Sequence, residues 1–362
     1  MGKSHQDPQA GANNLLVNCI GVKPGETVLI IREREGIDYY DEGVPELVGQ
    51  AAGDMGANVT TVCEPMLKGP EHVPDEISRG IQRADHTIFF SRIGDQIRFS
   101  KLEGGGTKTM CYALNLEYLG SEFCTVPHGL MDRILAKLEA EIDVAREWHI
   151  TCPLGTDVRG EHDFEPPEPG TKSGFSLLNF PIGTFRPLSC KTMNGRVVVS
   201  RWLTPSGSHL YEPDHLIIDN PIAAIVKDGR ITGFDGDSET VRKVEKHYHT
   251  VAGQLDINPD IVHSWHAGIN GQTYYSDPPT ENLWRWANLT FSSPRRLHFH
   301  TCGDYPPGEI AWSIYDQSVY FDSVLYWKDG RFVYLDREDL HALLDEFPTG
   351  AKALQMRTDI GV

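Results

Sequence analysis

Alternate positions of one short segment carry side chains that can bind a metal ion: His298, His300, Cys302 and Asp304. In a β-strand, alternate side chains lie on the same face. Imidazole, thiolate and carboxylate groups could therefore converge on one point. Either histidine is a candidate ligand, and Cys302 is a candidate nucleophile or a small buried residue.

Two further segments hold groups of the same kind. His263 and His266 lie upstream, the latter in a glycine-containing turn, and Tyr320 and Asp322 lie downstream at alternate positions. Apolar residues flank Asp322, and a buried carboxylate requires a cation or hydrogen-bond donors. Neutral imidazoles with a carboxylate are ligands of zinc and of non-haem iron(II). We therefore expect a metalloenzyme.

Other side chains could complete such a site. Tyr305 could donate a hydrogen bond to developing oxyanion charge, or could be a core residue. Arg92 and Arg98 follow a predicted strand end and could bind an acidic substrate across a cleft, or could face solvent. Trp265 could form a wall for a flat ring, or could pack in the core. Tyr320 is a candidate weak ligand, proton donor or packing residue.

The elements that must position these residues fall into two groups. In residues 1–158, short apolar runs predict strands at Thr27–Ile31, Val59–Cys63, His86–Phe90 and Thr107–Ala113. Between and after them, helical periodicity predicts helices at 44–55, 75–83 and 130–148. This alternation predicts an α/β domain with a parallel sheet.

The second group begins after residues 159–174, which contain Glu-Pro-Pro-Glu-Pro-Gly without periodicity and are predicted to be a linker. Residues 175–362 contain predicted strands with Asn-Gly or Asp-Gly turns, at 196–202, 215–218, 223–226 and 331–335. One helix near 238–254 interrupts them. This region is predicted to be a β-rich α+β domain that holds the metal site.

The composition excludes several classes of partner. The 362 residues carry a formal net charge of −18, so neither a nucleic acid nor an anionic membrane surface is expected as a partner. No apolar run approaches the roughly 20 residues of a membrane span, and the N-terminus lacks the apolar region of a secretory signal. Seven cysteines without a Cys-x-x-Cys pair are typical of reduced thiols, so we expect a cytoplasmic protein.

Several short motifs resemble, in their order along the chain, the thermophilic aminopeptidase T family. They are 22–30 (VKPGETVLI), 179–184 (NFPIGT), 266–270 (HAGIN), His298 with Tyr305, and 320–322 (YFD). The resemblance implies an N-terminal α/β domain, a C-terminal metal domain and at least a dimer. Glutamates of the family correspond to Thr184 and His266 here, and a histidine corresponds to Tyr320. A two-metal peptidase site therefore lacks most of its carboxylates.

The chain is similar in one respect to the 2,5-dihydroxypyridine 5,6-dioxygenase branch of that superfamily. That branch also has a histidine at the position of His266 and a carboxylate at that of Asp322, and it binds a single iron(II). The resemblance implies a metal held by His266, His298 and Asp322, the two-histidine, one-carboxylate set that leaves open positions on iron(II). His300 is then an acid–base candidate outside the ligand set.

The leading hypothesis is thus a mononuclear Fe(II) dioxygenase that opens a hydroxylated aromatic or N-heteroaromatic ring. Its partners would be a small aromatic substrate and dioxygen. Arg92, Arg98 and Trp265 would contact the substrate, and Tyr305 and Tyr320 would donate hydrogen bonds. The alternatives are a hydrolase that uses zinc or manganese to activate water, and a binding module whose site has been lost.

Overall fold

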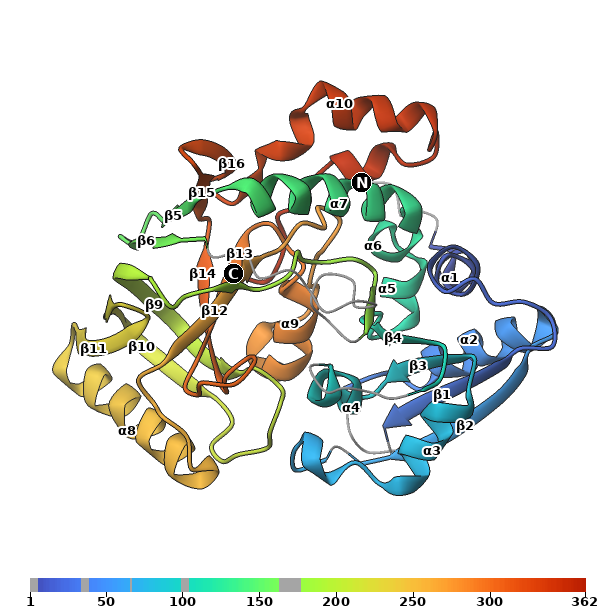
Figure 1. Ribbon diagram of the computed structural model, residues 1–362, viewed down its shortest axis with the longest axis horizontal. Coiled ribbons are helices and arrows are strands. Elements are labelled where there is room, and N and C mark those ends of the chain that lie inside the picture. The colour runs from blue at the N-terminus through green and yellow to red at the C-terminus, as the bar shows by residue number, and fades with distance from the viewer. Residues whose placement is uncertain (1–5, 34–38, 66, 99–103, 163–176) are drawn as a thin grey trace.

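The computed structural model describes the chain except residues 1–5, 34–38, 66, 99–103 and 163–176. Figure 1 shows two β-sheets side by side, a smaller one drawn in blue to teal and a larger one in green to red. Helix α7 runs along one edge of the molecule above both sheets, and α9 lies between them. The molecule therefore has one region where the two sheets meet.

The smaller sheet is parallel and has the strand order β2-β1-β3-β4-β7. Its strands are β1 (Thr27–Glu33), β2 (Asn58–Glu64), β3 (His86–Phe90), β4 (Thr107–Cys111) and β7 (Leu178–Phe180). Its helices are α1 (Pro8–Asn13), α2 (Gly43–Asp54), α3 (Asp75–Arg83), α4 (Arg92–Ile97), α5 (Leu116–Gly120), α6 (Glu122–Thr125) and α7 (His128–Val144). The predicted parallel α/β architecture is confirmed.

Local sequence explains these elements. Every residue of β3 is buried, as expected for a central parallel strand covered on both faces. In α3 the buried residues Ile77 and Ile81 are four apart and lie on one helix face. Helix α4 begins after Ser91, whose hydroxyl accepts a hydrogen bond from the backbone N–H of Ile93. This cap starts α4 directly at the carboxyl end of β3.

The larger sheet is antiparallel, with the order β17-β16-β15-β5-β6-β9-β14-β13-β12-β8 and with β10 and β11 joined to β9. Its strands are β5 (Glu147–Thr151), β6 (Asp157–Glu161), β8 (Leu188–Ser189), β9 (Asn194–Pro205), β10 (Leu216–Lys227), β11 (Arg230–Asp235), β12 (Val262–Ala267), β13 (Arg296–Thr301), β14 (Ile310–Tyr315), β15 (Ser318–Phe321), β16 (Val324–Lys328) and β17 (Arg331–Phe332). Its helices are α8 (Ser238–Leu255), α9 (Leu283–Thr290) and α10 (Glu338–His341). The predicted β-rich second region is confirmed.

Four predicted elements need correction. The helix predicted to reach Trp148 ends at Val144, because Trp148 and Ile150 are buried at alternate positions and form β5. The two strands predicted at 215–218 and 223–226 are one strand, β10, whose register shifts between Ile218 and Ile222. Pro221 lies in that shift, where it does not have to donate to the ladder. The strand predicted at 331–335 ends at Phe332 and continues as a 3₁₀ turn.

The two sheets exchange strands across the predicted domain boundary. Strands β5 and β6 precede residue 162 but pair within the antiparallel sheet, and β7 follows the predicted linker but pairs with β4. Residues 159–161, predicted as linker, belong to β6. Residues 163–174 of that linker lie outside the described residues. The limits of the two domains stay a prediction.

Strand β6 packs closely against β5 at Gly160. This residue lies opposite Trp148, and a Cβ added to it would lie 2.4 Å from Cζ2 of the buried tryptophan ring. We expect Gly160→Ala to destabilise the protein by about 1–3 kcal/mol, because the ring must move within a close-packed core. The measurement is the Tm of the variant. Gly233→Ala is the control, since nothing lies within 4 Å of its added Cβ, and an equal fall in Tm for both would contradict the prediction.

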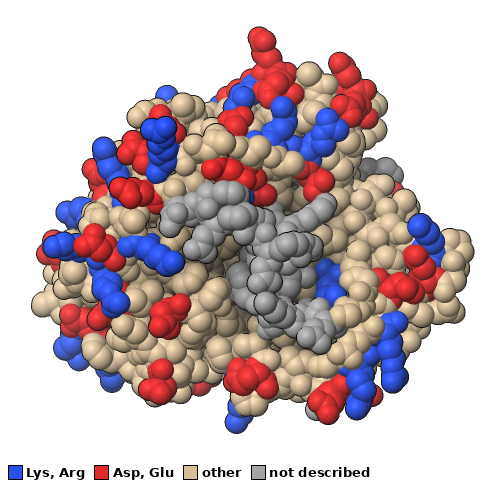
Figure 2. Space-filling model, viewed as in Figure 1, with Lys and Arg blue, Asp and Glu red and all other residues tan. Residues whose placement is uncertain are grey.

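Among the described residues, no helix is long and apolar enough to cross a membrane. On the face drawn in Figure 2, acidic and basic side chains are interspersed and no continuous basic area is visible.

Candidate metal centre

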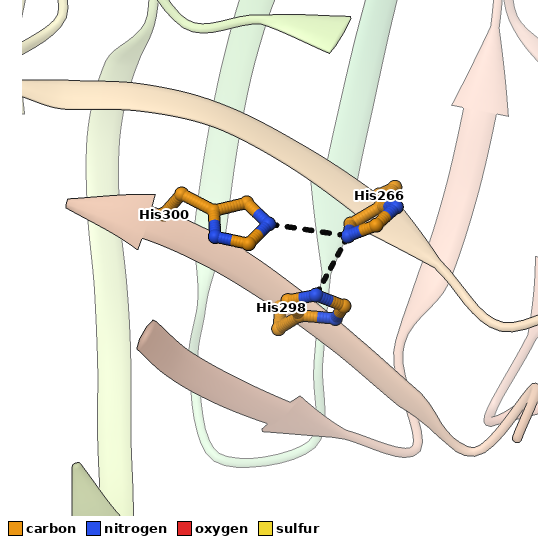
Figure 3. A group of neighbouring side chains, drawn as sticks. All are labelled: His266, His298 and His300. Atoms are coloured by element: carbon orange, nitrogen blue, oxygen red, sulfur yellow. Dashed lines mark hydrogen bonds between the residues drawn. The ribbon is translucent and has the colours of Figure 1, made fainter. Parts of the chain in front are cut away.

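Three histidines from two neighbouring strands form one cluster. Strands β12 and β13 are antiparallel, with His266 directly opposite His298, and His300 lies two residues further along β13. Residues directly opposite each other on paired strands lie on the same face of a sheet, and so do alternate residues of one strand. The three imidazoles therefore point to a common centre, as Figure 3 shows. They are the only group of three or more His, Cys, Asp or Glu side chains in the described part of the chain that could hold a metal ion.

The Nε2 atoms of the three rings face one another. Nε2 of His266 lies 2.6 Å from Nε2 of His298 and 3.2 Å from Nε2 of His300. Nδ1 of His266 lies 3.3 Å from the carbonyl oxygen of Phe185, which can only accept, so Nδ1 carries the proton. Its Nε2 then directs a lone pair at the centre. Nδ1 of His300 contacts Oγ of Ser206 at 3.1 Å, which allows the same tautomer.

Burial keeps all three imidazoles neutral. It lowers the pKa of His266 to about 3 and the pKa values of His298 and His300 well below their usual range. The guanidinium groups of Arg98 and Arg296 lower each of these pKa values further. Neutral imidazole is the form that binds metal.

The donor set fits one divalent ion. Two nitrogens that each lie about 2.0–2.1 Å from one ion are roughly 3 Å apart, which is close to the 3.2 Å between His266 and His300. The 2.6 Å contact between His266 and His298 is shorter and would have to open slightly. Among the described residues, no carboxylate or thiol joins the three histidines. The ligand set is therefore neutral, and imidazole suits zinc, copper, iron and nickel alike.

A small cavity of about 50 Å³ opens beside the cluster. Two small residues of the antiparallel sheet line the cavity beside the histidines. Ala311 on β14 lies opposite His300, and Thr204 on β9 lies opposite Ala311. Its apolar walls come from Pro187, Pro205, Ala287, Phe291 and Pro307. The cavity has room for a few waters or one small ring rather than for a large ligand.

The opposite wall of the cavity comes from the parallel sheet. Asp95 and Arg98 lie on or just after α4, which follows β3, and Tyr112 follows β4. Ligands of open α/β sheets bind at the carboxyl ends of the strands, and these side chains extend from that edge. The histidines thus face the edge where the parallel sheet positions polar groups.

Arg98, predicted to contact substrate, lines this cavity. Its Nη2 donates to Oδ1 of Asp95 at 2.5 Å and to the hydroxyl of Tyr112. Burial alone lowers the pKa of Arg98, but Tyr112 and Asp95 outweigh this effect and the pKa rises. Arg98 therefore stays charged at the cavity, with one carboxylate beside it.

Arg92, the other arginine predicted to contact substrate, is not among the residues that line the cavity. Its guanidinium stacks on the ring of Trp284, with Cζ 3.7 Å from the ring centroid, and its Nε lies 3.5 Å from Oδ2 of Asp95. The residue is buried, and its backbone N–H donates to Oε1 of Glu33 at 2.9 Å. Arg92 thus lies beside Asp95 and outside the lining of the cavity, and its contact with substrate stays a prediction.

Arg296 is the third charged residue that lines the cavity, and it was not selected as a site residue from the sequence. It precedes His298 by two positions on β13 and so lies on the histidine face. Its guanidinium donates to the carbonyl of Ala287, to Oγ1 of Thr290 and to Oγ of Ser313. The alternation Arg296–His298–His300 was the signal that could have revealed it.

Asp322, predicted as the third ligand, does not lie with the histidines. It is exposed, and its Oδ1 accepts hydrogen bonds from the backbone N–H groups of Arg146 and Glu147 at 2.9 and 3.1 Å. Both Asp322 and Ser323 have positive φ and form the tight turn between β15 and β16. The apolar neighbours in the sequence belong to the two strands, so they do not bury the turn.

Two predicted aromatic site residues also lie elsewhere. Trp265 is fully buried on the opposite face of β12 from His266, where it packs against Trp148 and Phe185. It belongs to the core and forms no wall of the cavity. Tyr320 stacks on His149, with ring centroids 5.7 Å apart. Neither residue is in the group that can hold the metal.

The end of β13 explains why the alternating cluster stops at His300. The strand ends at Thr301, and Cys302 has a positive φ of 62°. Cys302 is buried, which raises the pKa of its thiol to about 12 and argues against a nucleophile. Asp304 lies exposed in the following turn.

Tyr305, predicted as a catalytic donor, belongs to a second polar cluster. Its hydroxyl donates to Oε1 of the fully buried Glu309 at 2.5 Å. His209 contacts the same oxygen through Nδ1 at 2.8 Å and contacts Glu71 through Nε2 at 3.2 Å. This cluster joins the loop that precedes α3 to the antiparallel sheet, and Tyr305 does not line the cavity beside the histidines.

The cluster predicts a pH dependence of stability. Glu309 and Glu71 raise the pKa of His209 above 6.5, so the protonated form favours the fold. This stabilisation is fully present below the unfolded pKa of about 6.5 and is lost as pH rises through the higher folded pKa. We expect His209→Gln to lower the Tm more at pH 6 than at pH 9. Equal decreases at both pH values would contradict this assignment.

Comparison with known proteins supports the fold. No known protein-family model and no curated protein matches the sequence. The structure of 2,5-dihydroxypyridine dioxygenase from Pseudomonas putida KT2440 is similar, with a TM-score of 0.63 and 14% sequence identity over 90% of this chain and 96% of that chain. This likeness establishes a shared fold over nearly the whole chain.

Two other solved chains match weakly. They are a putative LacI-family transcription repressor from Corynebacterium glutamicum and an aspartate aminotransferase from Thermus thermophilus. Both have TM-scores of 0.20, which are too low to indicate a shared fold. The resemblance of the sequence motifs to the aminopeptidase T family is not tested by any of these matches and stays a prediction.

Proposed function

We propose that the protein is a mononuclear metal-dependent dioxygenase that opens a hydroxylated, single aromatic or N-heteroaromatic ring. The observation that carries this proposal is the convergence of three neutral imidazoles on one centre beside a small, mostly apolar cavity. The fold shared with a dihydroxypyridine dioxygenase supports it. The metal is proposed to be Fe(II), held by His266, His298 and His300.

The reaction breaks one ring carbon–carbon bond and adds both atoms of dioxygen to the two carbons, so no external reductant is required. Bound iron(II) would supply open coordination positions and the one-electron chemistry that dioxygen requires. In this assignment His300 is a ligand, whereas the sequence suggested an acid–base role outside the ligand set. The cavity size limits the substrate to a small ring.

The residues of the chain have separate roles. Pro187, Phe291 and Pro307 would exclude water from the faces of the ring. Burial raises the pKa of Tyr112, so its hydroxyl keeps its proton, which it donates to Oδ1 of Asp95 at 3.3 Å and so helps to hold that carboxylate beside Arg98. Arg98 would place a positive charge near developing negative charge on the substrate. We further propose a cytoplasmic homo-oligomer, as the sequence indicates.

The test is oxygen uptake by protein that is purified without air and loaded with Fe(II). A panel of hydroxylated pyridines and benzoates is supplied, and ¹⁸O₂ labelling follows the oxygen atoms. We expect uptake that depends on substrate, with two labelled oxygens in a ring-opened product. Iron-loaded protein that consumes no oxygen with any member of the panel would contradict the proposal.

The ligand set favours one second candidate. Three histidines with an open position also form a catalytic zinc site that lowers the pKa of bound water. A zinc hydrolase acting on an amide or ring-carbonyl bond is therefore the alternative. Such an enzyme would work equally well without air, so turnover under nitrogen by zinc-loaded protein would favour it over the dioxygenase.

A further inference from the structure

The charges around the cavity do not balance. Of the described residues that line it, Arg98 and Arg296 are cationic and Asp95 is the only anionic one. Asp95 already pairs with Arg98. Imidazole binds metal in its neutral form, so a divalent ion held by the three histidines would add two further positive charges. Buried charge of one sign is costly unless a counter-charge is present.

Arg296 is the group without a counter-ion. Its residue is only 2% exposed, yet its guanidinium pairs with no carboxylate among the described residues. All three of its hydrogen-bond acceptors are neutral, and they use only Nε and Nη1. Nη2 makes no hydrogen bond to any described residue, so one edge of the planar guanidinium has donors left for a ligand.

Arg296 and the histidines are spaced to contact one ligand together. Arg296 and His298 occupy alternate positions of β13 on the cavity face, and Nε of Arg296 donates to Oγ of Ser313, the residue directly opposite His298. The guanidinium and the imidazole of His298 therefore lie on the same side of the cavity. Phe291 lies beside both His298 and Tyr112, with ring centroids 6.2 and 4.8 Å away, and can pack against the ring of a ligand.

We infer that Arg296 binds the carboxylate of a single-ring hydroxylated aromatic acid, whose hydroxyl oxygen reaches the metal held by the histidine cluster. The inference rests on the proposed function for the role of the metal. The substrate's negative charge replaces the carboxylate that the protein ligand set lacks. A carboxylate oxygen can accept a charge-assisted hydrogen bond from Nη2, the one guanidinium nitrogen whose N–H groups are not already used within the described residues.

A purely structural role for Arg296 makes a different prediction. Its bonds to Ala287 and Thr290 hold the C-terminal turn of α9, where a cation is favourable. In that case replacement would reduce stability without changing which ligands bind. The test must therefore compare ligands that differ only in charge.

The experiment is calorimetric titration of zinc-loaded protein, which cannot run the proposed oxygen-dependent reaction, and recovery of each probe unchanged is verified after the titration. The probes are 2-, 3- and 4-hydroxybenzoate, each paired with the corresponding uncharged hydroxybenzamide. For the isomer that binds best, we expect wild-type protein to prefer the carboxylate by about 10- to 100-fold, the range expected for hydrogen bonds to a charged group. Arg296→Gln should reduce this ratio to near 1 without changing zinc stoichiometry.

A neighbouring arginine provides the matched control. Arg295 pairs with Asp316 and is not among the residues that line the cavity, so Arg295→Gln should keep the wild-type ratio. If Arg296→Gln does not fold, Arg296→Lys keeps the charge and should retain a carboxylate preference with weaker binding. A wild-type ratio near 1, or a ratio that Arg296→Gln leaves unchanged, would overturn the inference.

The outcomes separate the inference from the proposed function. Zinc binding without any carboxylate preference would refute the role of Arg296 and leave the metal centre intact. Absence of zinc binding would instead refute the metal centre. The same titrations of that metal-free protein would then still decide whether Arg296 selects a carboxylate.

Discussion

Replacement of His266 by alanine is expected to lower the affinity for a divalent ion by more than about 100-fold. The reason is geometric, since Nε2 of His266 lies within 3.2 Å of both other Nε2 atoms and completes the set. Loss of groups outside the ligand set alone typically costs 10- to 100-fold in metal affinity, and loss of a ligand should cost more. The measurement is titration of the metal-free protein with Zn(II) or, without air, Fe(II).

Two variants make this prediction specific. His263→Ala removes a histidine from the same strand whose ring contacts Ser264 and lies outside the cluster, so metal affinity should be unchanged. Asp322→Ala should also retain the metal, because Asp322 accepts hydrogen bonds from the backbone in an exposed turn. Loss of metal in both Asp322→Ala and His266→Ala would restore the ligand set inferred from the sequence, whereas retention of metal in His266→Ala would contradict both ligand sets.

Filling the cavity is expected to abolish turnover without removing the metal. Ala311 lies opposite His300 and is buried in the cavity wall, so Ala311→Phe would place a ring where the substrate must bind. We expect kcat/KM to fall at least 100-fold, which corresponds to about 2.7 kcal/mol. The measurement is oxygen uptake at several substrate concentrations, with metal content determined on the same sample.

Ala311→Ser is the control for this variant, since it changes the volume little. It should retain activity within a few-fold of the wild type. If Ala311→Phe retains both its metal and full activity, the substrate does not bind in the cavity beside the histidines. A moderate decrease in Tm is expected because overpacking costs about 1–3 kcal/mol.

The parallel α/β region could be predicted from the sequence because local pattern and final structure agree there. Strand β3 and helix α3 have the predicted limits, since a continuous apolar run and a four-residue apolar spacing each fit one element only. The exchange of β5, β6 and β7 between the two sheets could not be predicted. It depends on pairing between distant segments, which local periodicity does not encode.

The histidine cluster could be predicted in part, because two of its three residues lie at alternate positions of one strand. Alternation on β13 places His298 and His300 on one face whatever the partner strand is. The position of His266 opposite His298 depends on the register of β12, which the sequence does not determine. Asp322 was predicted to be buried because its neighbours in the sequence are apolar. In the structure it lies exposed in a two-residue turn between two strands.

The charged residues of the cavity show the limit of prediction from composition and motif. Arg98 could be selected because it follows a strand end of the parallel sheet. Arg296 is the first residue of β13 and was not selected from the sequence, although it is buried in the structure. Its lack of a carboxylate partner becomes visible only once all of its neighbours are known.

The most direct test of the central claim is the X-ray absorption spectrum of protein loaded with one equivalent of Fe(II) without air. We predict about one tightly bound iron per chain, with the scattering of three imidazole rings and with oxygen ligands that respond to added substrate. His266→Ala should lose this signal. Protein that retains no metal, or a metal whose spectrum lacks the imidazole rings, would contradict the assignment and leave the cluster as a group of hydrogen-bonded core histidines.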